Sequence, residues 1–280
     1  MPFLNIPNGS IFYEIHGQGP PIVFIHGAWS SHKWWKYQTS DFSQKYRLLI
    51  YDLRGHGQSL SSIDEFSVHS FADDLNLILK NIGIEETILV GWSLGGMISI
   101  EYFLQHPQRT KALILISMRT QRQPIWKRKI WVAYLRARLN LMMNLSAPRK
   151  FNLPEATFPD EKLHREEEIK KMFSTTISPE IDAWIKDDLK NFSFHNFWQI
   201  AKNLWDWEIS DEKLAKIHIP ALILVGEKDQ ITPPSLAHSL QQAIPHSQLL
   251  IIKEAGHLLP IEQPQIVNSH IAEFLKSINY

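Results

Sequence analysis

The chain has 280 residues, and 44% of them are hydrophobic. A chain of this length can bury a large core and is long for one simple domain. Its 29 basic and 29 acidic residues cancel, so the overall charge gives no reason to expect a nucleic acid as a partner. The absence of cysteine excludes disulfides, thiolate metal sites and a cysteine nucleophile.

The first residues, 1–7, have neither the basic region nor the long apolar stretch of a signal peptide. No apolar run in the chain approaches the ~18 residues of a membrane span. We therefore expect a cytoplasmic protein without membrane contact. Directly after this segment, Gly9 and Ser10 are expected to form the turn of an antiparallel hairpin at one edge of a sheet.

Short apolar runs that indicate strands alternate with segments of helical periodicity along most of the chain. The runs lie at residues 11–15, 22–25, 48–51, 88–90, 112–116, 221–225 and 249–252. One helix is expected between a Ser67 cap and Gly83, and others at 94–105, 235–243 and 266–278. Several runs are apolar throughout, as strands covered on both faces are, which favours a mostly parallel, doubly wound α/β sheet.

Residues 118–217 interrupt this alternation, because they contain helical and aromatic-rich pieces but no clear strand. We interpret them as a helical lid (the predicted lid) inserted into a core domain made of residues 1–117 and 218–280. Residues 102–154 include eleven Lys or Arg and no Asp or Glu. Nine of these eleven lie within the predicted lid: Arg119, Arg122, Lys127, Arg128, Lys129, Arg136, Arg138, Arg149 and Lys150.

Within the predicted lid, residues 125–143 form two apolar stripes on a helical wheel, with basic residues between them, so this helix is expected to need cover on both sides. The basic surface would suit an acidic partner protein. A solvated basic helix above an ordinary pocket is the alternative, and contact with membrane lipid is a weaker third one.

Residues 91–96, Gly-Trp-Ser-Leu-Gly-Gly, lie between an apolar run and a helical segment. Glycines two positions before and after Ser93 allow a sharp strand-to-helix turn that exposes the serine hydroxyl at the helix N-terminus. A serine hydroxyl is a poor nucleophile at neutral pH, so Ser93 needs a base, an orienting acid and donors for an oxyanion. A purely structural turn is the alternative.

Two later residues are candidates for the acid and the base. Asp229 follows the run that ends at residue 225, and His257 follows the run that ends near residue 252, so both are expected at the carboxyl edge of the sheet. Glu227 is a nearby competitor for the role of acid. The backbone N–H groups of Leu94 and Ala28 are expected to hold the oxyanion.

We expect no cofactor and no metal, because no group of residues has metal-ligand spacing. His26 is expected to brace the loop that carries Ala28, and residues 52–56 to form a structural turn.

These segments together resemble the α/β-hydrolase superfamily over about residues 10–117 and 218–278. The resemblance is carried by residues 26–27 (His-Gly), 52–59 (Asp-Leu-Arg-Gly-His-Gly-Gln-Ser), 91–96, 226–229 (Gly-Glu-Lys-Asp) and 256–257 (Gly-His). It implies the α/β-hydrolase fold with a helical lid insertion and a triad in the order Ser93, Asp229, His257. Haloalkane dehalogenases and epoxide hydrolases have aspartate at the nucleophile position, so Ser93 argues against both.

The resemblance therefore implies a serine carboxylesterase that forms an acyl-enzyme from a small-molecule or acyl-chain ester. The turn around Ser93 and the basic lid are similar to those of pimeloyl-acyl-carrier-protein methyl ester esterases, which implies an acidic carrier protein at the lid. A lactonase or a C–C bond hydrolase with the same triad, or a ligand receptor that keeps the triad, are alternatives that the sequence leaves open.

Overall fold

The computed structural model describes residues 3–7, 9–61, 66–120, 173–174, 177–190, 199–201, 203–204 and 206–280. The helix expected at 125–143 lies outside the described residues. So do eight of the nine basic residues of the segment 102–154 that belong to the predicted lid, all except Arg119.

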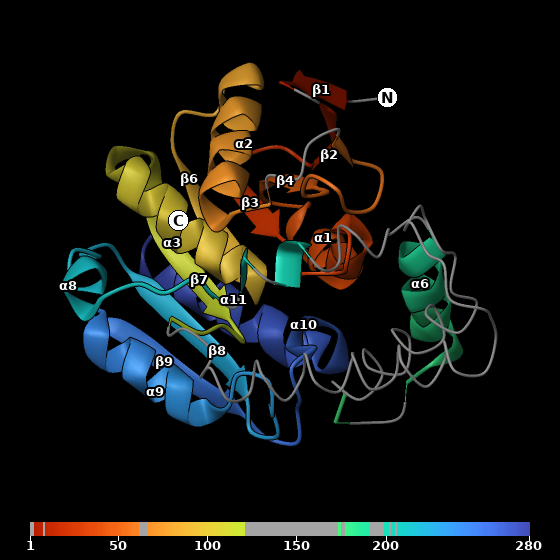
Figure 1. Ribbon diagram of the computed structural model, residues 1–280. Helices are drawn as coiled ribbons and strands as arrows, with labels where there is room; N and C mark the ends of the chain where they lie inside the picture. Colours follow the sequence, from red (N-terminus) through yellow and green to blue (C-terminus); the bar gives the residue numbers. More distant parts are fainter. Residues whose placement is uncertain are drawn as a thin grey trace, which may run out of the picture.

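A single twisted sheet forms the centre of the molecule (Figure 1). Along the sheet the order is β1-β2-β4-β3-β6-β7-β8-β9, and the short β5 pairs with β2. From β4 to β9 neighbouring strands are parallel, while β2 pairs antiparallel with β1, β4 and β5. The strands are β1 (Phe3–Ile6), β2 (Gly9–His16), β3 (Pro21–Ile25), β4 (Arg47–Tyr51), β5 (Leu60–Ser61), β6 (Thr87–Trp92), β7 (Thr110–Ile116), β8 (Ala221–Gly226) and β9 (Ser247–Ile252).

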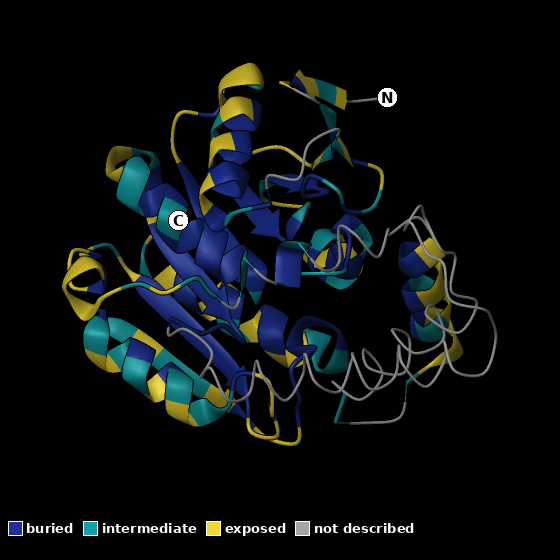
Figure 2. Cartoon of the chain, in the orientation of Figure 1, coloured by how far each residue is buried: buried dark blue, intermediate teal, exposed yellow. Residues whose placement is uncertain are grey.

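The predicted α/β class and mostly parallel sheet are confirmed, and each apolar run of the sequence lies in a strand. Two separate groups of buried residues explain why these runs are apolar throughout. Val23 and Leu89 belong to the core on one face of the sheet, whereas their neighbours Ile22 and Ile88 belong to the core on the other. Helices cover both faces, so the inner strands β6 and β8 are buried along their whole length (Figure 2).

The first core contains residues of helices α2, α3 and α9, and the second contains residues of α1, α10 and α11. The helix α2 is capped by Ser67, whose side chain accepts a hydrogen bond from the Ser70 N–H, as the sequence predicts. Gly83, with φ +69°, follows its end. The helices with their bounds are α1 (Lys36–Phe42), α2 (Val68–Asn81), α3 (Leu94–Gln105), α6 (Pro179–Lys190), α8 (Asp211–Leu214), α9 (Pro234–Ala243), α10 (Leu259–Glu262) and α11 (Pro264–Ser277), with short 3₁₀ turns η1 (His32–Trp35) and η2 (Pro107–Arg109).

The antiparallel hairpin predicted at one edge of the sheet is confirmed by β1 and β2, but the predicted position of its turn, at Gly9 and Ser10, is wrong. Both residues belong to β2, where Gly9 pairs with Ile6, so the chain turns earlier, around Pro7. Proline has no N–H to continue a ladder, which explains why β1 ends before it. Gly9 is required for close packing and not for a turn. A Cβ at residue 9 would lie 2.2 Å from the Leu60 carbonyl oxygen, because β5 packs closely there.

Between β7 and β8 the described elements are the helices α6 and α8, which belong to the predicted lid. The helix α6 stands beside α1, away from the centre of the sheet (Figure 1). The division into a core domain and a lid stays a prediction. In the part of the chain that the structure describes, no helix is long and apolar enough to cross a membrane.

Candidate active site

Ser93 is held in a strained turn between β6 and α3. Its backbone has φ 54° and ψ −112°, a conformation that costs a non-glycine residue on the order of 1–3 kcal/mol. A Cβ at Gly91 would lie 2.3 Å from the Gly95 carbonyl oxygen, so only glycine permits so tight a turn. Every residue from 87 to 100 is buried except Ser93, which is partly exposed. The fold therefore presents this one side chain at the sheet edge.

His257 and Asp229 complete a hydrogen-bonded series with Ser93. His257 Nε2 lies 3.2 Å from Ser93 Oγ, and His257 Nδ1 lies 2.9 Å and 3.1 Å from the two carboxylate oxygens of Asp229. Since a carboxylate only accepts, Nδ1 carries the proton and Nε2 is free to accept the proton of the serine hydroxyl. This is the tautomer that a general base toward Ser93 requires.

Asp229 is 98% buried, and it stays ionised because its surroundings favour the charge. Burial alone would raise its pKa, but the charge and hydrogen bond of His257 and the hydrogen bonds of Thr232 hold the pKa of Asp229 below its ordinary value. The N–H groups of Ile231 and Thr232 and the Thr232 hydroxyl donate to the carboxylate at 2.9, 2.8 and 2.7 Å. Glu227, the competitor considered from the sequence, is exposed and reaches the N–H of Glu254 instead.

Thr232 is a site residue that sequence reasoning missed. Its hydroxyl oxygen lies 2.7 Å from Asp229 Oδ2 and 3.2 Å from His257 Nδ1, so it touches two members of the group at once. A hydroxyl residue three positions after an aspartate is a recognisable turn pattern, which was the available signal.

The two expected oxyanion donors lie on segments that meet at the turn. Leu94 is the first residue of α3, and N–H groups in the first turn of a helix have no acceptor within the helix. A Cβ at Gly95 would lie 2.0 Å from the Ile25 carbonyl oxygen, so the start of α3 rests directly on the end of β3. This contact brings the loop after β3, with its partly exposed Ala28, to the start of α3. The roles of Ala28 and Leu94 stay predictions.

His26 braces that loop from within the core. Its Nε2 accepts a hydrogen bond from the Leu53 N–H at 3.0 Å, which leaves the proton on Nδ1 to be donated to the Gly27 carbonyl at 2.7 Å. Burial lowers the pKa of His26 to about 4, so the ring is neutral at neutral pH and this tautomer persists.

Residues 52–56 form a structural turn, as expected. Asp52 accepts hydrogen bonds from the N–H and the ring of His32, and Arg54 makes a buried two-point contact with Asp74. Burial lowers the pKa of His56 to about 3. No group of three or more His, Asp or Glu residues within the described ranges is arranged to hold a metal ion.

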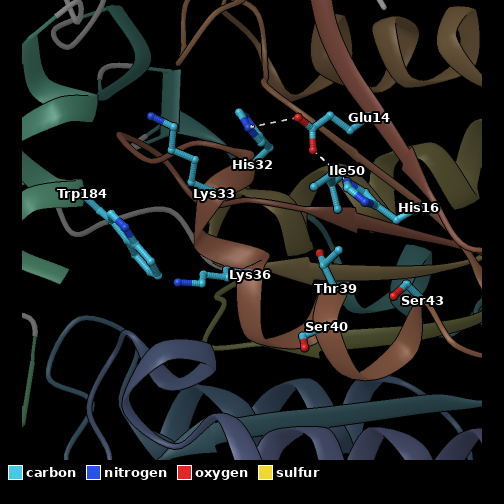
Figure 3. A pocket seen from close by; sticks show the side chains of 10 residues that line it. All are labelled: Glu14, His16, His32, Lys33, Lys36, Thr39, Ser40, Ser43, Ile50 and Trp184. Carbon is cyan, nitrogen blue, oxygen red and sulfur yellow. Dashed lines mark hydrogen bonds and ion pairs between the residues drawn. The ribbon is translucent and has the colours of Figure 1, made fainter. Parts of the chain in front are cut away.

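A separate cavity of about 510 Å³ lies between α1, the strands β2 and β4, and α6, and none of its lining residues belongs to the triad. Lys33 and Lys36 at its rim pair with Asp187 and Glu180 of α6, and Trp184 of α6 lies 5.3 Å from the Lys36 ammonium. The charged groups that line the cavity thus largely neutralise one another. We interpret the cavity as a gap where α6 packs against the sheet. It is lined by Glu14, His16, His32, Lys33, Lys36, Thr39, Ser40, Ser43, Ile50 and Trp184 (Figure 3).

Comparison with known proteins supports the fold described above. The alpha/beta hydrolase fold family matches residues 20–264 of the chain. The AB hydrolase superfamily protein YisY of Bacillus subtilis (strain 168) is 30% identical over 273 residues, 96% of each chain. The uncharacterized carboxylesterase nap of the same strain is 25% identical over 267 residues, 92% of this chain and 80% of its own. The structure of Est816, an N-acyl homoserine lactone degrading enzyme, has a TM-score of 0.76 and 26% identity, covering 98% of this chain and 100% of its own.

Proposed function

The chain belongs to the alpha/beta hydrolase fold family, and from the arrangement of Ser93, His257 and Asp229 we propose that it is a serine hydrolase of carboxylic esters. The observation that supports this most is the 3.2 Å contact between His257 Nε2 and Ser93 Oγ, together with the 2.9 Å contact on the other side of the same ring. A nucleophile, a base and an orienting acid are thereby aligned at a partly exposed serine.

In the proposed reaction, His257 takes the hydroxyl proton as Ser93 Oγ attacks the ester carbonyl carbon. The N–H groups of Leu94 and Ala28 stabilise the negative charge that develops on the carbonyl oxygen. His257 then gives the proton to the departing alcohol, which leaves an acyl group on Ser93. A water molecule, deprotonated by His257, attacks this acyl-enzyme and releases the carboxylic acid, and the proton returns to Ser93. Asp229 keeps the ring of His257 in the required tautomer throughout.

The test is turnover of a chain-length series of p-nitrophenyl esters by the wild type and by Ser93→Ala. We expect kcat of the variant to fall by about 10⁴-fold or more. A fluorophosphonate should label the wild type on the peptide that contains Ser93 and leave Ser93→Ala unlabelled. Ser269→Ala, an exposed serine on α11, is the matched control and should keep full activity. Undiminished turnover by Ser93→Ala would refute the proposal.

A lactone is the second candidate substrate, because Est816, 26% identical across nearly the whole of this chain, degrades N-acyl homoserine lactones. Lactone opening uses the same nucleophile and base, and differs in that the leaving alcohol stays attached to the product. Comparing kcat/KM for an N-acyl homoserine lactone with that for an acyclic ester of equal acyl length decides between the two.

We also propose an acidic acyl-carrier protein as a partner, on the basis of the basic residues of the predicted lid. Most of these residues lie outside the described ranges, so the proposal rests on the sequence. A methyl ester carried on acyl-carrier protein belongs in the same substrate series. A higher kcat/KM for the carrier-bound ester than for the free one supports the proposal, and equal values contradict it.

A further inference from the structure

The carboxylate of Glu262 binds the backbone on both sides of His257. Glu262 is the last residue of α10 and is partly buried. It accepts hydrogen bonds from the Gly256 N–H, 3.1 Å from each carboxylate oxygen, and from the Leu258 N–H at 3.1 Å. Hydrogen bonds to an ionised acceptor are stronger than neutral ones. One side chain therefore fixes the peptide groups that precede and follow the histidine.

A third contact holds residues 256–258, which form the short loop around His257 (the histidine loop). The Trp92 indole N–H donates to the His257 carbonyl oxygen at 2.9 Å, from the residue directly before Ser93. The direction of the imidazole thus depends on Trp92 at the carbonyl and on Glu262 at the two N–H groups. Two carboxylates of the described residues contact this loop: Asp229 at the ring and Glu262 at the backbone.

Glu262 also contacts the predicted lid. Its Oε2 accepts a hydrogen bond from the Ser174 N–H at 2.8 Å and another from the Ser174 hydroxyl. The same hydroxyl lies 2.9 Å from the Glu254 carbonyl oxygen. Among the described residues, the Glu262 carboxylate forms no ion pair with a lysine or arginine. Its charge is therefore balanced by the N–H and O–H dipoles of the histidine loop and of Ser174.

We infer that Glu262 is a positioning residue for the catalytic base, and that it couples the lid segment at Ser174 to His257. The inference rests on the proposed function, in which His257 Nε2 must stay within reach of Ser93 Oγ. That contact is already 3.2 Å long, so a movement of the loop by a few tenths of an ångström weakens proton transfer. A lid that moves away from Glu262 withdraws two of its donors and changes how firmly the histidine loop is held.

Steady-state kinetics of Glu262→Gln and Glu262→Ala on a short p-nitrophenyl ester test the inference. Glutamine keeps one acceptor oxygen but turns an amide group toward a donor, whereas alanine removes every contact. We expect kcat to fall about tenfold in Glu262→Gln and about 100-fold in Glu262→Ala, with KM little changed. The acid limb of the kcat/KM profile should also move to lower pH, because a nearby negative charge that favours protonated imidazole is lost.

The control is Glu254→Gln, which removes a carboxylate two residues before Gly256. The Glu254 side chain is exposed and pairs with Lys228, outside the histidine loop. Its kcat and its pH profile should match the wild type. If Glu254→Gln shifted the pH profile as Glu262→Gln does, the shift would be caused by general surface charge, and the positioning role of Glu262 would be wrong.

Ser174→Ala tests the coupling to the lid in a double-mutant cycle with Glu262→Gln. We expect Ser174→Ala to lower kcat by about two- to threefold alone and to have no further effect when Glu262 is already replaced. Fully additive effects would overturn the coupling.

The imidazole NMR titration of His257 separates this inference from the proposed function. If the wild type turned over no ester, the proposed function would fail, yet a shifted titration in Glu262→Gln would still support positioning. Wild-type kcat together with an unshifted titration in folded Glu262→Gln would overturn it.

Discussion

Thr232 connects two members of the triad, and its hydroxyl group can be removed with little change of shape. In Thr232→Val, Asp229 Oδ2 loses a 2.7 Å hydrogen bond that helps to keep its charge. We expect the pKa of Asp229 to rise, kcat to fall about tenfold as the ring of His257 is held less firmly, and the free energy of unfolding to fall by about 1 kcal/mol. Ester kinetics and urea unfolding measure both effects.

Thr110→Val is the matched control for that prediction. Thr110 is buried at the start of β7, the end of the sheet away from Ser93, and its hydroxyl oxygen has no hydrogen-bond partner in the part of the chain that the structure describes. Removing an unpartnered buried hydroxyl should leave kcat unchanged and should not lower stability. Equal losses of activity in the two variants would contradict a role for Thr232 at the site.

The difference between predictable and unpredictable site residues has a physical basis at this scale. Ser93, Asp229 and His257 each follow an apolar strand closely, so the sequence alone places them at one sheet edge. Thr232 and Glu262 act through hydrogen bonds whose partners depend on the path of a loop. The turn pattern of Asp229 and Thr232 predicts their mutual contact at most, so the contacts of Thr232 and Glu262 with the histidine loop appear only in three dimensions.

At the scale of elements, a buried carboxylate attaches α6 to the loop and the 3₁₀ turn η1 that follow β3. Asp188 accepts hydrogen bonds from the Ser31 hydroxyl at 2.8 Å and from the Trp34 indole N–H at 2.5 Å. Trp34 in turn stacks on Trp92, with ring centroids 5.4 Å apart. The ion pairs of α6 with Lys33 and Lys36 are exposed and contribute little, so Asp188 is the main polar contact of α6, beside the apolar side chains that α6 adds to the second core.

Asp188 should make the stability of the molecule depend on pH. Burial, helped by the charge of Asp52, raises the pKa of Asp188 from 3.8 to about 6, although the hydrogen bonds from Trp34 and Ser31 oppose the rise. Between pH 4 and pH 6 the folded state therefore holds a proton that the unfolded state has released. The free energy of unfolding contributed by this group falls as the pH rises through that range, by about 3 kcal/mol, and is constant above it.

Urea unfolding of the wild type and of Asp188→Asn at pH 4, 5, 6 and 7 checks this expectation. Asparagine is neutral throughout, and it can accept from Trp34 while donating to the Ser31 hydroxyl, so the variant should lack this part of the decline. Asp187→Asn, on the exposed side of the same helix, should keep it. A decline of the same size in Asp188→Asn would mean that other groups cause it.

Elements differ in how well the sequence predicts them, for reasons of burial and length. Strands covered on both faces need continuous apolar runs, and each of these runs was recognised. The edge strands β1 and β5, with four and two residues, were not, because they exist through pairing with β2 rather than through a pattern of their own. The hairpin turn was misplaced because a glycine needed for close packing was interpreted as one needed for turning.

At the scale of the whole molecule, the site exists because distant segments end at the same place. The strands β6, β8 and β9 are parallel, with β7 between the first two. The residues that follow these strands therefore meet at one edge of the sheet, although more than a hundred positions separate Ser93 from Asp229. The loop after β3 reaches the same edge, because α3 packs against the end of that strand. The activity and the assembly of the sheet therefore depend on the same close contact.

Gly95 is the residue that permits this contact, and Gly95→Ala tests it. A Cβ there would lie 2.0 Å from the Ile25 carbonyl oxygen and 2.9 Å from that of His26, both backbone atoms that cannot rotate away. We expect α3 to be displaced from β3, with a loss of about 3 kcal/mol or more in the free energy of unfolding. The kcat of the folded variant should fall as well, because the Ala28 loop and Ser93 no longer keep their spacing.

The matched control is Gly83→Ala, where a Cβ has open space and only the φ of +69° is unfavourable. We expect this variant to lose about 1 kcal/mol in the free energy of unfolding and no activity. Similar losses in the two variants, measured by urea unfolding and ester turnover, would show that backbone conformation, and not the close approach of α3 to β3, is what Gly95 provides.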